Sequence, residues 1–331
     1  MNKFKKIGLT ALAASLVSVS AHAGSMSVAG SASITAEGYS GESLNKGTGF
    51  SMGNQLTFSG SGELDNGMNV SLSFVIDEFD NATTTATNGG AADGSLFDGH
   101  SVTVSSDSLG TLKFAGEGGS SAASSIDGSA AGDIWDTFDG SRGAVTATAI
   151  TDSGPGNNSL FYTLPSMVDG FDINVSYQPQ AGNRVSATGY GVSYTGLDGL
   201  TAKYATTDEV GATTAASGDQ TVWNVSYVYG PVTATVSNHD YDVETTTSDQ
   251  EMTSYAISYT VSDDLSITYG AEEISEGGTS KVDAEYTAIS ASYTMGGMTI
   301  SAAMKDGENT DHGTASNQDF EYWSLGASFA F

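Results

Sequence analysis

Hydrophobic and polar residues alternate along much of this chain. In the last segment Trp323, Leu325, Ala327, Phe329 and Phe331 occupy every second position, and small, mostly polar residues lie between them. Successive side chains of a β-strand point to opposite faces, so the five share one apolar face. A soluble sandwich can use one such strand, but repetition in nearly every strand is typical of a transmembrane barrel that is apolar outside and polar inside.

Short turn signals rich in Gly, Asp and Asn separate pairs of alternating runs, and each predicts a hairpin with one apolar face. They lie at 64–67, 106–110, 167–170, 197–199, 229–231, 262–264 and 295–297. These seven hairpins give fourteen strands, and strands over 25–38 and 321–331 bring the total to sixteen. The predicted fold class is therefore all-β, a 16-stranded antiparallel transmembrane β-barrel.

Long polar segments connect the hairpins. They lie near 39–53, 77–99, 116–158, 178–188, 205–220, 238–250, 271–285 and 305–320. Short turns at one end and long loops at the other are typical of bacterial outer-membrane barrels, with the turns in the periplasm. Tyrosines near strand ends predict an aromatic girdle at the membrane interfaces, although strand propensity alone also favours tyrosine. They are Tyr177, Tyr194, Tyr204, Tyr227, Tyr229, Tyr259, Tyr269 and Tyr293.

The N-terminus has the form of a secretory signal. Lys3, Lys5 and Lys6 precede an apolar stretch over 7–19, and Ala-His-Ala at 21–23 fits a signal-peptidase site. We therefore predict a cleaved signal peptide at 1–23 and a barrel domain at 24–331. A retained anchor is the alternative, but the stretch is short for a bilayer span. Export without any cysteine fits a bacterial envelope.

The chain is strongly acidic. The predicted signal holds three of the ten Lys and Arg residues and no acid, which leaves 7 − 39 = −32 as the formal net charge. Such a charge disfavours nucleic acid as a partner. It fits a saline habitat, where dissolved ions screen repulsion between carboxylates. The mean hydropathy of −0.14 suits a barrel that hides polar residues in its lumen and loops.

Several stretches resemble a known family. They are Gln55–Phe74, Leu109–Gly116, Asn158–Pro165 and the terminal Phe331. On these the chain resembles the trimeric general porins of Gram-negative bacteria, particularly the alphaproteobacterial, Rhodobacter-like type. The resemblance implies a homotrimer in outer-membrane lipid and lipopolysaccharide, and insertion by the assembly machinery that reads the C-terminal strand. It also implies passive diffusion of small hydrophilic solutes and ions.

The segment from Gly116 to Asn157 is the longest predicted loop. In porins like these the third loop folds into the barrel and narrows the pore. Here it carries Glu117, Asp127, Asp133, Asp136, Asp139 and Asp152 against one base, Arg142, with Ile134, Trp135 and Phe138 available to pack on the inner wall. A carboxylate ring at a constriction favours cations. The alternative is a solvated acidic surface loop without a role in conduction.

Porin constrictions usually set arginines on the wall opposite that loop, and this chain departs from the pattern. Its only arginines are Arg142 and Arg184. By alternation Lys113 and Lys203 face the lumen and are the better wall candidates. Each is equally explained as a single charge placed inward because lipid excludes it. A simply electronegative pore is therefore the prediction.

Metal and enzyme chemistry have weak support. The acidic loops are compatible with Ca²⁺, or with divalent cations bridging to lipopolysaccharide, but their spacing matches no EF-hand or nonapeptide array, so we expect no cofactor. His100, His239 and His312 lie in or beside predicted loops without a catalytic motif, and we expect surface histidines and no enzyme. Two alternatives to a porin remain, a plugged or adhesive outer-membrane barrel and a secreted acidic β-protein.

Overall fold

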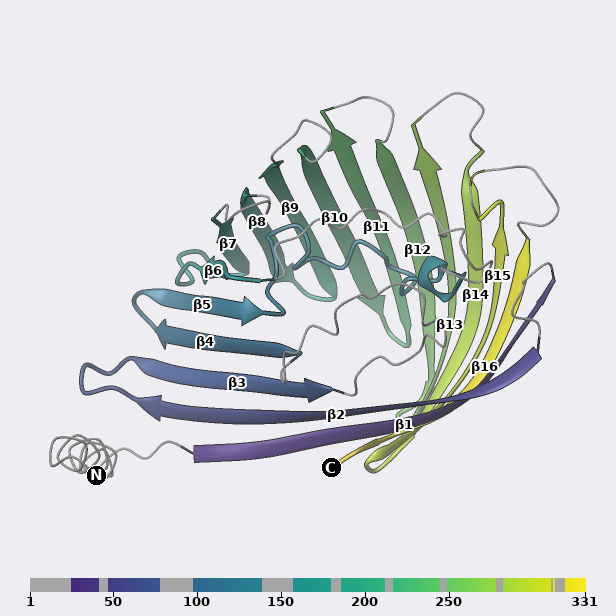
Figure 1. Ribbon diagram of the computed structural model, residues 1–331, viewed down its shortest axis with the longest axis horizontal. Coiled ribbons are helices and arrows are strands. Elements are labelled where there is room, and N and C mark those ends of the chain that lie inside the picture. Colours follow the sequence, from purple (N-terminus) through teal and green to yellow (C-terminus); the bar gives the residue numbers. More distant parts are fainter. Residues whose placement is uncertain are drawn as a thin grey trace, which may run out of the picture.

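The computed structural model describes residues 25–41, 47–77, 98–138, 157–179, 186–211, 217–244, 249–277, 282–310, 312 and 319–331. Over these residues sixteen antiparallel strands form a closed barrel in which each strand pairs with the next and β1 pairs with β16 (Figure 1). This confirms the predicted fold class. No helix in these ranges is long and apolar enough to cross a membrane. The signal peptide predicted at 1–23 lies outside the described residues.

The strands differ in length around the barrel. The first eight are β1 (Ser25–Gly41), β2 (Gly47–Glu63), β3 (Asn69–Asp77), β4 (Gly99–Ser106), β5 (Gly110–Glu117), β6 (Ser159–Thr163), β7 (Phe171–Gln178) and β8 (Ser186–Leu197). The others are β9 (Leu200–Val210), β10 (Gly218–Tyr229), β11 (Val232–Val243), β12 (Gln250–Ser262), β13 (Leu265–Glu276), β14 (Ala284–Met295), β15 (Met298–Glu308) and β16 (Phe320–Ala330). A short 3-10 helix, η1 (Trp135–Phe138), lies between β5 and β6.

The seven predicted turns join the strand pairs at one end of the barrel. Several of them need glycine. Gly199 has a φ of +75°, a conformation that side-chain-bearing residues rarely adopt, and a Cβ there would lie 2.5 Å from the carbonyl oxygen of Val228. Gly170 likewise has a φ of +79°. Turn chemistry was therefore a sound guide to where the chain reverses direction.

At the loop end the predicted strand boundaries were wrong. The loop expected at 39–53 is mostly strand, because β1 continues to Gly41, β2 begins at Gly47, and Tyr39 pairs with Gly47. The odd-numbered strands β9 to β15 also extend past their predicted ends, so β13 includes Glu272 and β15 includes Lys305. Glycine and acidic residues made these stretches read as loops, but pairing with a neighbouring strand outweighs local propensity.

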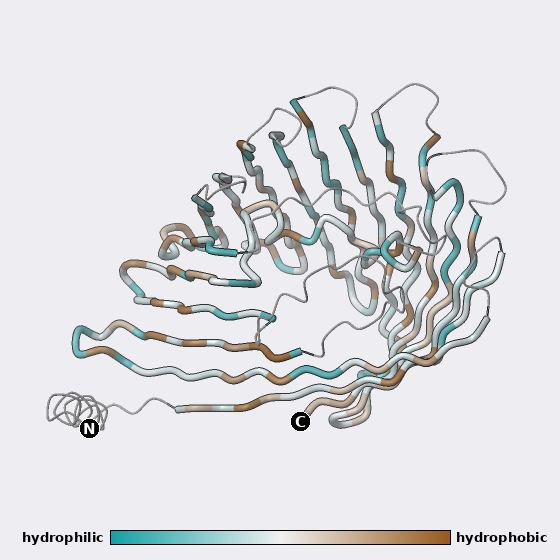
Figure 2. Tube along the Cα trace, viewed as in Figure 1, coloured by the Kyte–Doolittle hydropathy of each residue, from teal (hydrophilic) through white to brown (hydrophobic). Residues whose placement is uncertain are grey.

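The apolar face of each strand points away from the barrel interior. On β12, Tyr255, Ile257 and Tyr259 are 54%, 57% and 49% exposed, whereas Ser254 and Ala256 on the opposite face are buried. Figure 2 shows the resulting alternation of hydrophobic and hydrophilic positions along the strands. An exposed apolar surface that follows every strand requires lipid or protein around it.

The outward face differs between two sectors of the barrel. The exposed tyrosines that the structure describes all lie on β7–β14: Tyr177, Tyr190, Tyr204, Tyr227, Tyr229, Tyr255, Tyr259, Tyr269 and Tyr293. The predicted girdle thus covers one sector. On β1 and β2 the outward face instead carries Ile34, Phe50 and Met52, which are 54%, 82% and 60% exposed.

A row of carboxylates lies on the outward face of β9–β16, toward the loop end and beyond the apolar band. Its members pair directly across the strands: Asp208 with Asp219, Asp219 with Asp242, Asp240 with Glu251, Glu273 with Glu285, Glu285 with Glu308, and Asp306 with Glu321. We call this set the carboxylate rim. Like charges placed directly opposite in a sheet repel each other.

The seam of the barrel joins its first and last strands. The Gly30 N–H donates to the Phe331 carbonyl at 2.8 Å, and the Phe331 N–H donates to the Gly30 carbonyl at 3.0 Å. Phe331 is 75% exposed on the outer surface. The predicted assembly residue therefore lies at the seam, on the lipid-compatible face.

A candidate constriction in the barrel lumen

The segment 118–138, which follows β5, crosses the inside of the barrel (Figure 1). Its backbone N–H groups donate to hydroxyl oxygens on four wall strands between β7 and β12 at 2.7–3.1 Å. The pairs are Ala122 to Ser176 on β7, Ala123 to Thr207 on β9, Ala130 to Ser237 on β11 and Ala131 to Ser254 on β12. Small residues on both sides permit this approach, since a Cβ on Gly270 of β13 would lie 2.6 Å from the Ala131 Cβ. The segment is therefore fastened to the wall by its backbone.

A buried wall carboxylate holds the tip of this segment. Glu272 on β13 is 3% exposed, and it accepts hydrogen bonds from the Ser129 hydroxyl and from the Trp135 N–H at 3.1 Å. The Ser129 oxygen in turn accepts from the Asp133 N–H at 2.6 Å. Asp133 has a φ of +48°, a left-handed conformation that Asp tolerates better than most residues. Glu272 thus fixes the backbone just before η1.

Hydrophobic contacts complete the anchor. Ile134 and Phe138 are 0% and 1% exposed, and Phe138 stacks on Tyr286 and Phe320 with ring centroids 5.8 and 6.3 Å apart. Trp135 is half-buried against the same cluster. The structure therefore brings together all three residues that the sequence offered for loop packing, and it adds aromatic partners from β14 and β16. A second cluster, Ala122, Ala123, Ile126, Ala205 and Val222, lies where the segment meets β9 and β10.

The acidic residues of the segment fall into two groups. Asp127, Asp133 and Asp136 surround one lumenal hollow of about 380 Å³ beside β10–β12. Glu117 lies apart from them at the end of β5, where its carboxylate is 4.0 Å from the His100 Nδ1. Asp139 and Arg142 lie outside the described residues. The predicted set of carboxylates is therefore only partly assembled in the structure.

The lumenal lysines occupy three different places. Lys113 on β5 borders a hollow of about 230 Å³ together with Ser125 and Phe161. Lys203 on β9 shares the inward face with Ala205. Lys305 on β15, which the sequence reading missed, donates to the Thr137 hydroxyl at 2.5 Å. Alternation with Met304 could have indicated that Lys305 points inward, but the predicted loop at 305–320 hid it.

The charge state of Asp133 is shifted by its surroundings. Burial raises the pKa of its carboxyl above the ordinary value, and the negative charge of Asp127 raises it further. Hydrogen bonding from Ser129 and the positive charge of Lys305 act in the opposite direction without cancelling the rise. Asp133 therefore takes up a proton at a higher pH than a free aspartate does.

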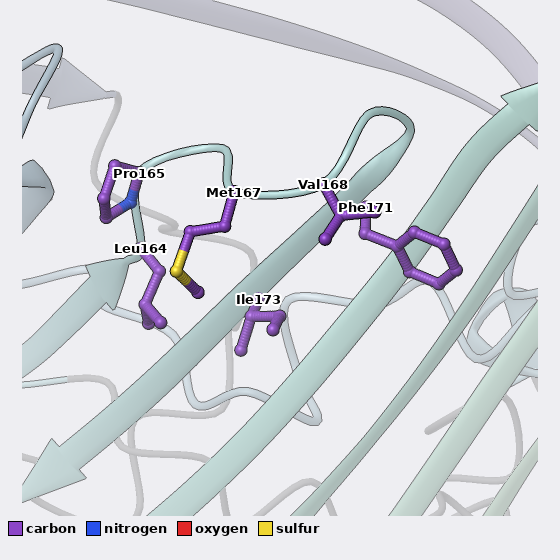
Figure 3. Close-up of a pocket in the computed structure, with 6 residues that line it drawn as sticks. All are labelled: Leu164, Pro165, Met167, Val168, Phe171 and Ile173. Carbon is purple, nitrogen blue, oxygen red and sulfur yellow. The ribbon is translucent and has the colours of Figure 1, made fainter.

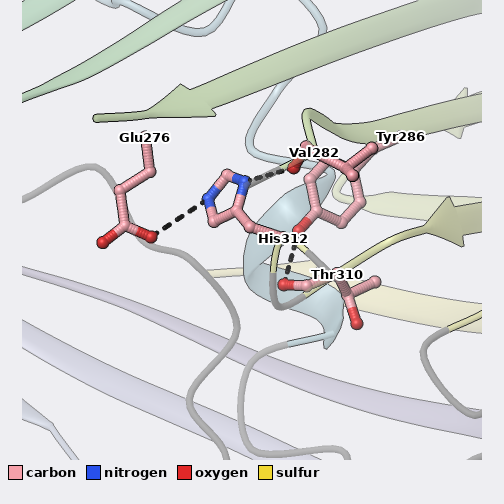
Figure 4. A network of polar contacts seen from close by, with 5 residues as sticks. All are labelled: Glu276, Val282, Tyr286, Thr310 and His312. Atoms are coloured by element: carbon pink, nitrogen blue, oxygen red, sulfur yellow. Dashed lines mark hydrogen bonds and ion pairs between the residues drawn. The ribbon is translucent and has the colours of Figure 1, made fainter. Parts of the chain in front are cut away.

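Of the three histidines that were expected at the surface, His239 and His312 are buried, so the prediction was wrong for these two. His312 is 2% exposed; its Nδ1 donates to the Val282 carbonyl at 2.8 Å and its Nε2 lies 3.7 Å from a Glu276 oxygen (Figure 4). The neighbouring Tyr286 hydroxyl donates to the Thr310 carbonyl at 3.5 Å. His239 is 8% exposed on β11. Both were misread because polar residues flank them, although strand pairing and loop packing bury the rings.

An apolar hollow of about 290 Å³ lies on the other side of the wall. It is formed by Leu164, Pro165, Met167, Val168, Phe171 and Ile173 at the turn between β6 and β7 (Figure 3). These side chains carry no polar groups, and Phe171 and Ile173 belong to the outward face. The hollow is therefore part of the apolar exterior. Within the described ranges, no group of three His, Cys, Asp or Glu residues is placed to hold a metal ion.

Comparison with known proteins places the barrel in a family. The family model described as Gram-negative porin matches residues 8–331. The chain belongs to the Gram-negative porin family. This porin is therefore an outer-membrane diffusion channel and not an enzyme. No curated protein matches it.

Solved structures share the fold of this porin at low sequence identity. An anion-selective porin from Comamonas acidovorans is 14% identical with a TM-score of 0.62, covering 93% of this chain and 100% of the other. A refined porin structure is 16% identical with a TM-score of 0.65 and the same coverage. OmpT, an outer-membrane protein of Vibrio cholerae, is 12% identical with a TM-score of 0.64, covering 93% and 98%.

Proposed function

We propose that this porin passes small hydrophilic solutes and ions through a water-filled lumen and that the channel prefers cations. The observation that carries the proposal is the fixed position of Asp127, Asp133 and Asp136 on a segment bonded to the inner wall. Carboxylates held in a narrow part of a pore raise the local concentration of cations. Lys305 beside them offsets part of this charge.

A basic patch facing the segment has little support in the described lumen. Lys113 lies beside the start of the segment, and Lys203 belongs to β9, which β6, β7 and β8 separate from β5. We therefore propose an electronegative pore without a strong transverse field. Within the described residues, the positive charges of Lys113, Lys203 and Lys305 reduce that electronegativity.

We further propose that the long-loop end faces the cell exterior and that β1 and β2 lie in the interface of a homotrimer. Phe50 and Met52 are among the most exposed apolar side chains, yet this sector carries no exposed tyrosine and no member of the carboxylate rim. A surface that is apolar without interfacial tyrosines suits a protein partner better than a lipid boundary. The assembly machinery and the outer-membrane lipid are the other partners we propose, with Phe331 at the seam as the assembly signal.

The test is the reversal potential of the purified protein in a planar bilayer under a KCl gradient. We expect a potential of the sign that marks K⁺ permeation, reduced by Asp133→Asn and Asp136→Asn. Asp172→Asn is the matched control, because Asp172 faces the lumen on β7 but lies outside the hollow. Anion preference, or no conductance from folded protein, would overturn the proposal and favour a plugged or adhesive barrel.

A further inference from the structure

The hollow beside the candidate constriction has two chemically different parts. Its floor is mostly apolar, because it is lined by Ile126 from the segment, Val222 from β10 and Met252 from β12, with the His239 ring of β11 between the last two. These four side chains are 7%, 1%, 3% and 8% exposed. Its rim carries the carboxylates of Asp127 and Asp133. The volume of about 380 Å³ falls within the range of small-molecule sites, roughly 300–1,000 Å³. The hollow therefore matches a solute that is itself apolar at one end.

The aromatic residue of the hollow favours a positive charge at the other end of that solute. Trp135 lines the hollow beside Asp136, and its backbone is fixed by the Glu272 carboxylate at 3.1 Å. An indole face attracts cations, and nearby carboxylates strengthen that attraction. A bare metal ion is a poorer fit, since no three acidic or histidine side chains in the described parts of the chain converge on a point.

The wall that forms the floor is also rigid. Asn224 on β10 donates from Nδ2 to the Asp127 carbonyl at 3.0 Å, and Ser237 on β11 donates to the Gly128 carbonyl at 2.7 Å. These bonds fix the backbone between the floor and the acidic rim. A preformed hollow of this kind binds a ligand without first ordering its own backbone.

We propose that this hollow is a binding subsite for organic ammonium solutes that carry an aromatic or aliphatic body, and that such solutes pause there during passage. The proposal rests on the proposed function, because it assigns a solute class to the same lumen. The ammonium group lies at the acidic rim beside Asp127 and Asp133, and the body lies over the floor beside the Trp135 ring. Small inorganic cations interact with the carboxylates but not with the apolar floor.

The first experiment records transient blockades of the KCl current through reconstituted protein when phenethylammonium is added. Ethylammonium carries the charge without the ring, and phenethyl alcohol carries the ring without the charge. We expect phenethylammonium to reside about tenfold longer than either, because it alone combines apolar burial with cation binding. Equal residence times for all three compounds would overturn the proposal. So would a residence time of ethylammonium, or of phenethyl alcohol, that equals that of phenethylammonium.

Variants locate the site. Val222→Thr keeps the shape of the floor but makes it polar, and Asp127→Asn keeps the size of the rim side chain but removes its charge. Each is expected to shorten phenethylammonium residence several-fold. Val222→Thr is expected to keep the wild-type reversal potential under a KCl gradient, whereas Asp127→Asn removes one carboxylate of the proposed channel and is expected to weaken cation preference as well. Phe161→Tyr and Asp172→Asn are matched controls from the lumen outside the hollow and are expected to change nothing. Equal effects of controls and site variants would contradict the assignment.

A second measurement does not depend on conduction. Trp223→Phe and Trp323→Phe leave Trp135 as the only tryptophan of the chain, and both replaced residues face outward. Phenethylammonium binding is then followed in detergent by the fluorescence of Trp135, with phenethyl alcohol as the control. Saturable binding with no open channel would remove the proposed function but keep the subsite. A cation-preferring channel with no saturable binding would keep the proposed function but remove the subsite.

Discussion

One buried side chain, Glu272, holds the tip of the segment on which Asp133 and Asp136 lie. Its carboxylate accepts hydrogen bonds from the Ser129 hydroxyl and from the Trp135 N–H. Removing one partner of such a bonded group leaves polar groups unsatisfied, which costs about 1–3 kcal/mol for each buried group. The position of the segment tip therefore depends on a residue that never needs to touch a permeating ion.

We accordingly expect Glu272→Ala to release the tip and to make the open-channel current noisier, with weaker cation preference. Glu272→Gln retains an acceptor oxygen and is expected to be milder. Single-channel recordings under a KCl gradient measure both effects. Glu273→Ala, on the outward face of the same strand, is the control. If Glu272→Ala and Glu273→Ala give the same current noise and reversal potential, the anchoring role is wrong.

A pH dependence follows from Asp133. The pKa of its carboxyl is raised in the folded protein, so the folded state binds this proton more tightly than the unfolded chain does. Its contribution to stability is therefore present at low pH and is lost as the pH rises from the ordinary aspartate range through the raised pKa. The negative charge that serves selectivity appears over the same interval.

As pH falls from neutral, cation preference is expected to begin declining above the range in which free aspartates titrate. Asp133→Asn should remove this early part of the decline and leave the later part intact. Reversal potentials recorded across a pH series give the answer. A wild-type profile that overlays the Asp133→Asn profile would contradict the assignment.

At the scale of elements, the segment 118–138, here called the constriction segment, and the barrel wall are separate units. They meet along two hydrophobic clusters and a series of backbone hydrogen bonds. The strand pairs of the barrel do not include the segment, and the segment has only η1 as regular structure. Local openings in proteins follow such divisions, and the part with fewer internal hydrogen bonds opens first. Loss of one anchor should therefore affect the segment before the barrel.

Phe138→Ala tests this order. It removes a ring that is 1% exposed between Tyr286 and Phe320, and core truncations of this kind cost roughly 3–5 kcal/mol. We expect faster proteolysis within 118–138 but an unchanged heat-dependent shift of the barrel on a gel. Phe114→Ala, whose ring is outward and 44% exposed, serves as the control. Simultaneous loss of barrel and segment would show that they are one cooperative unit.

The division between elements also explains what the sequence predicted well. Turn residues and strict alternation are local properties, so the hairpins, their number and the outward faces of residues such as Tyr255 followed from them. Strand ends did not follow, because pairing with a neighbour extends β13 to Glu276 and β15 to Glu308 through polar residues. Glu272 and Lys305 were missed for this reason. The hollow was missed as well, since it joins residues more than a hundred positions apart, such as Asp127 and Met252.

For the whole molecule, the distribution of charge differs between the two surfaces of the wall. The carboxylate rim stacks like charges across β9–β16, and no described lysine or arginine lies on that outward face. Repulsion between exposed charges of this kind is screened by salt over roughly 10 Å at 0.1 M. The barrel is therefore expected to become more heat-resistant as salt increases.

The temperature at which the folded band disappears on a gel, measured after heating at low and high NaCl, checks this expectation. Glu285→Gln interrupts the run from Glu273 to Glu308 and should reduce the salt effect. Asp172→Asn, inside the lumen, should leave it unchanged. Equal heat resistance of the wild type at both salt concentrations would remove support for the saline-habitat hypothesis as well.

The hydrogen bonds of the constriction segment also have a mechanical meaning. From β7 to β16 the wall is backed by a second layer of chain, and Tyr39 on β1 donates to the Thr137 carbonyl at 3.0 Å. The hydrogen bonds described for the segment join it to none of β2, β3 and β4. A β-sheet with a second layer of chain bonded to it resists bending more than a single sheet does. Lateral pressure from the bilayer should therefore flatten the cross-section on the unbacked side, so that the pore changes shape while the carboxylates keep their spacing.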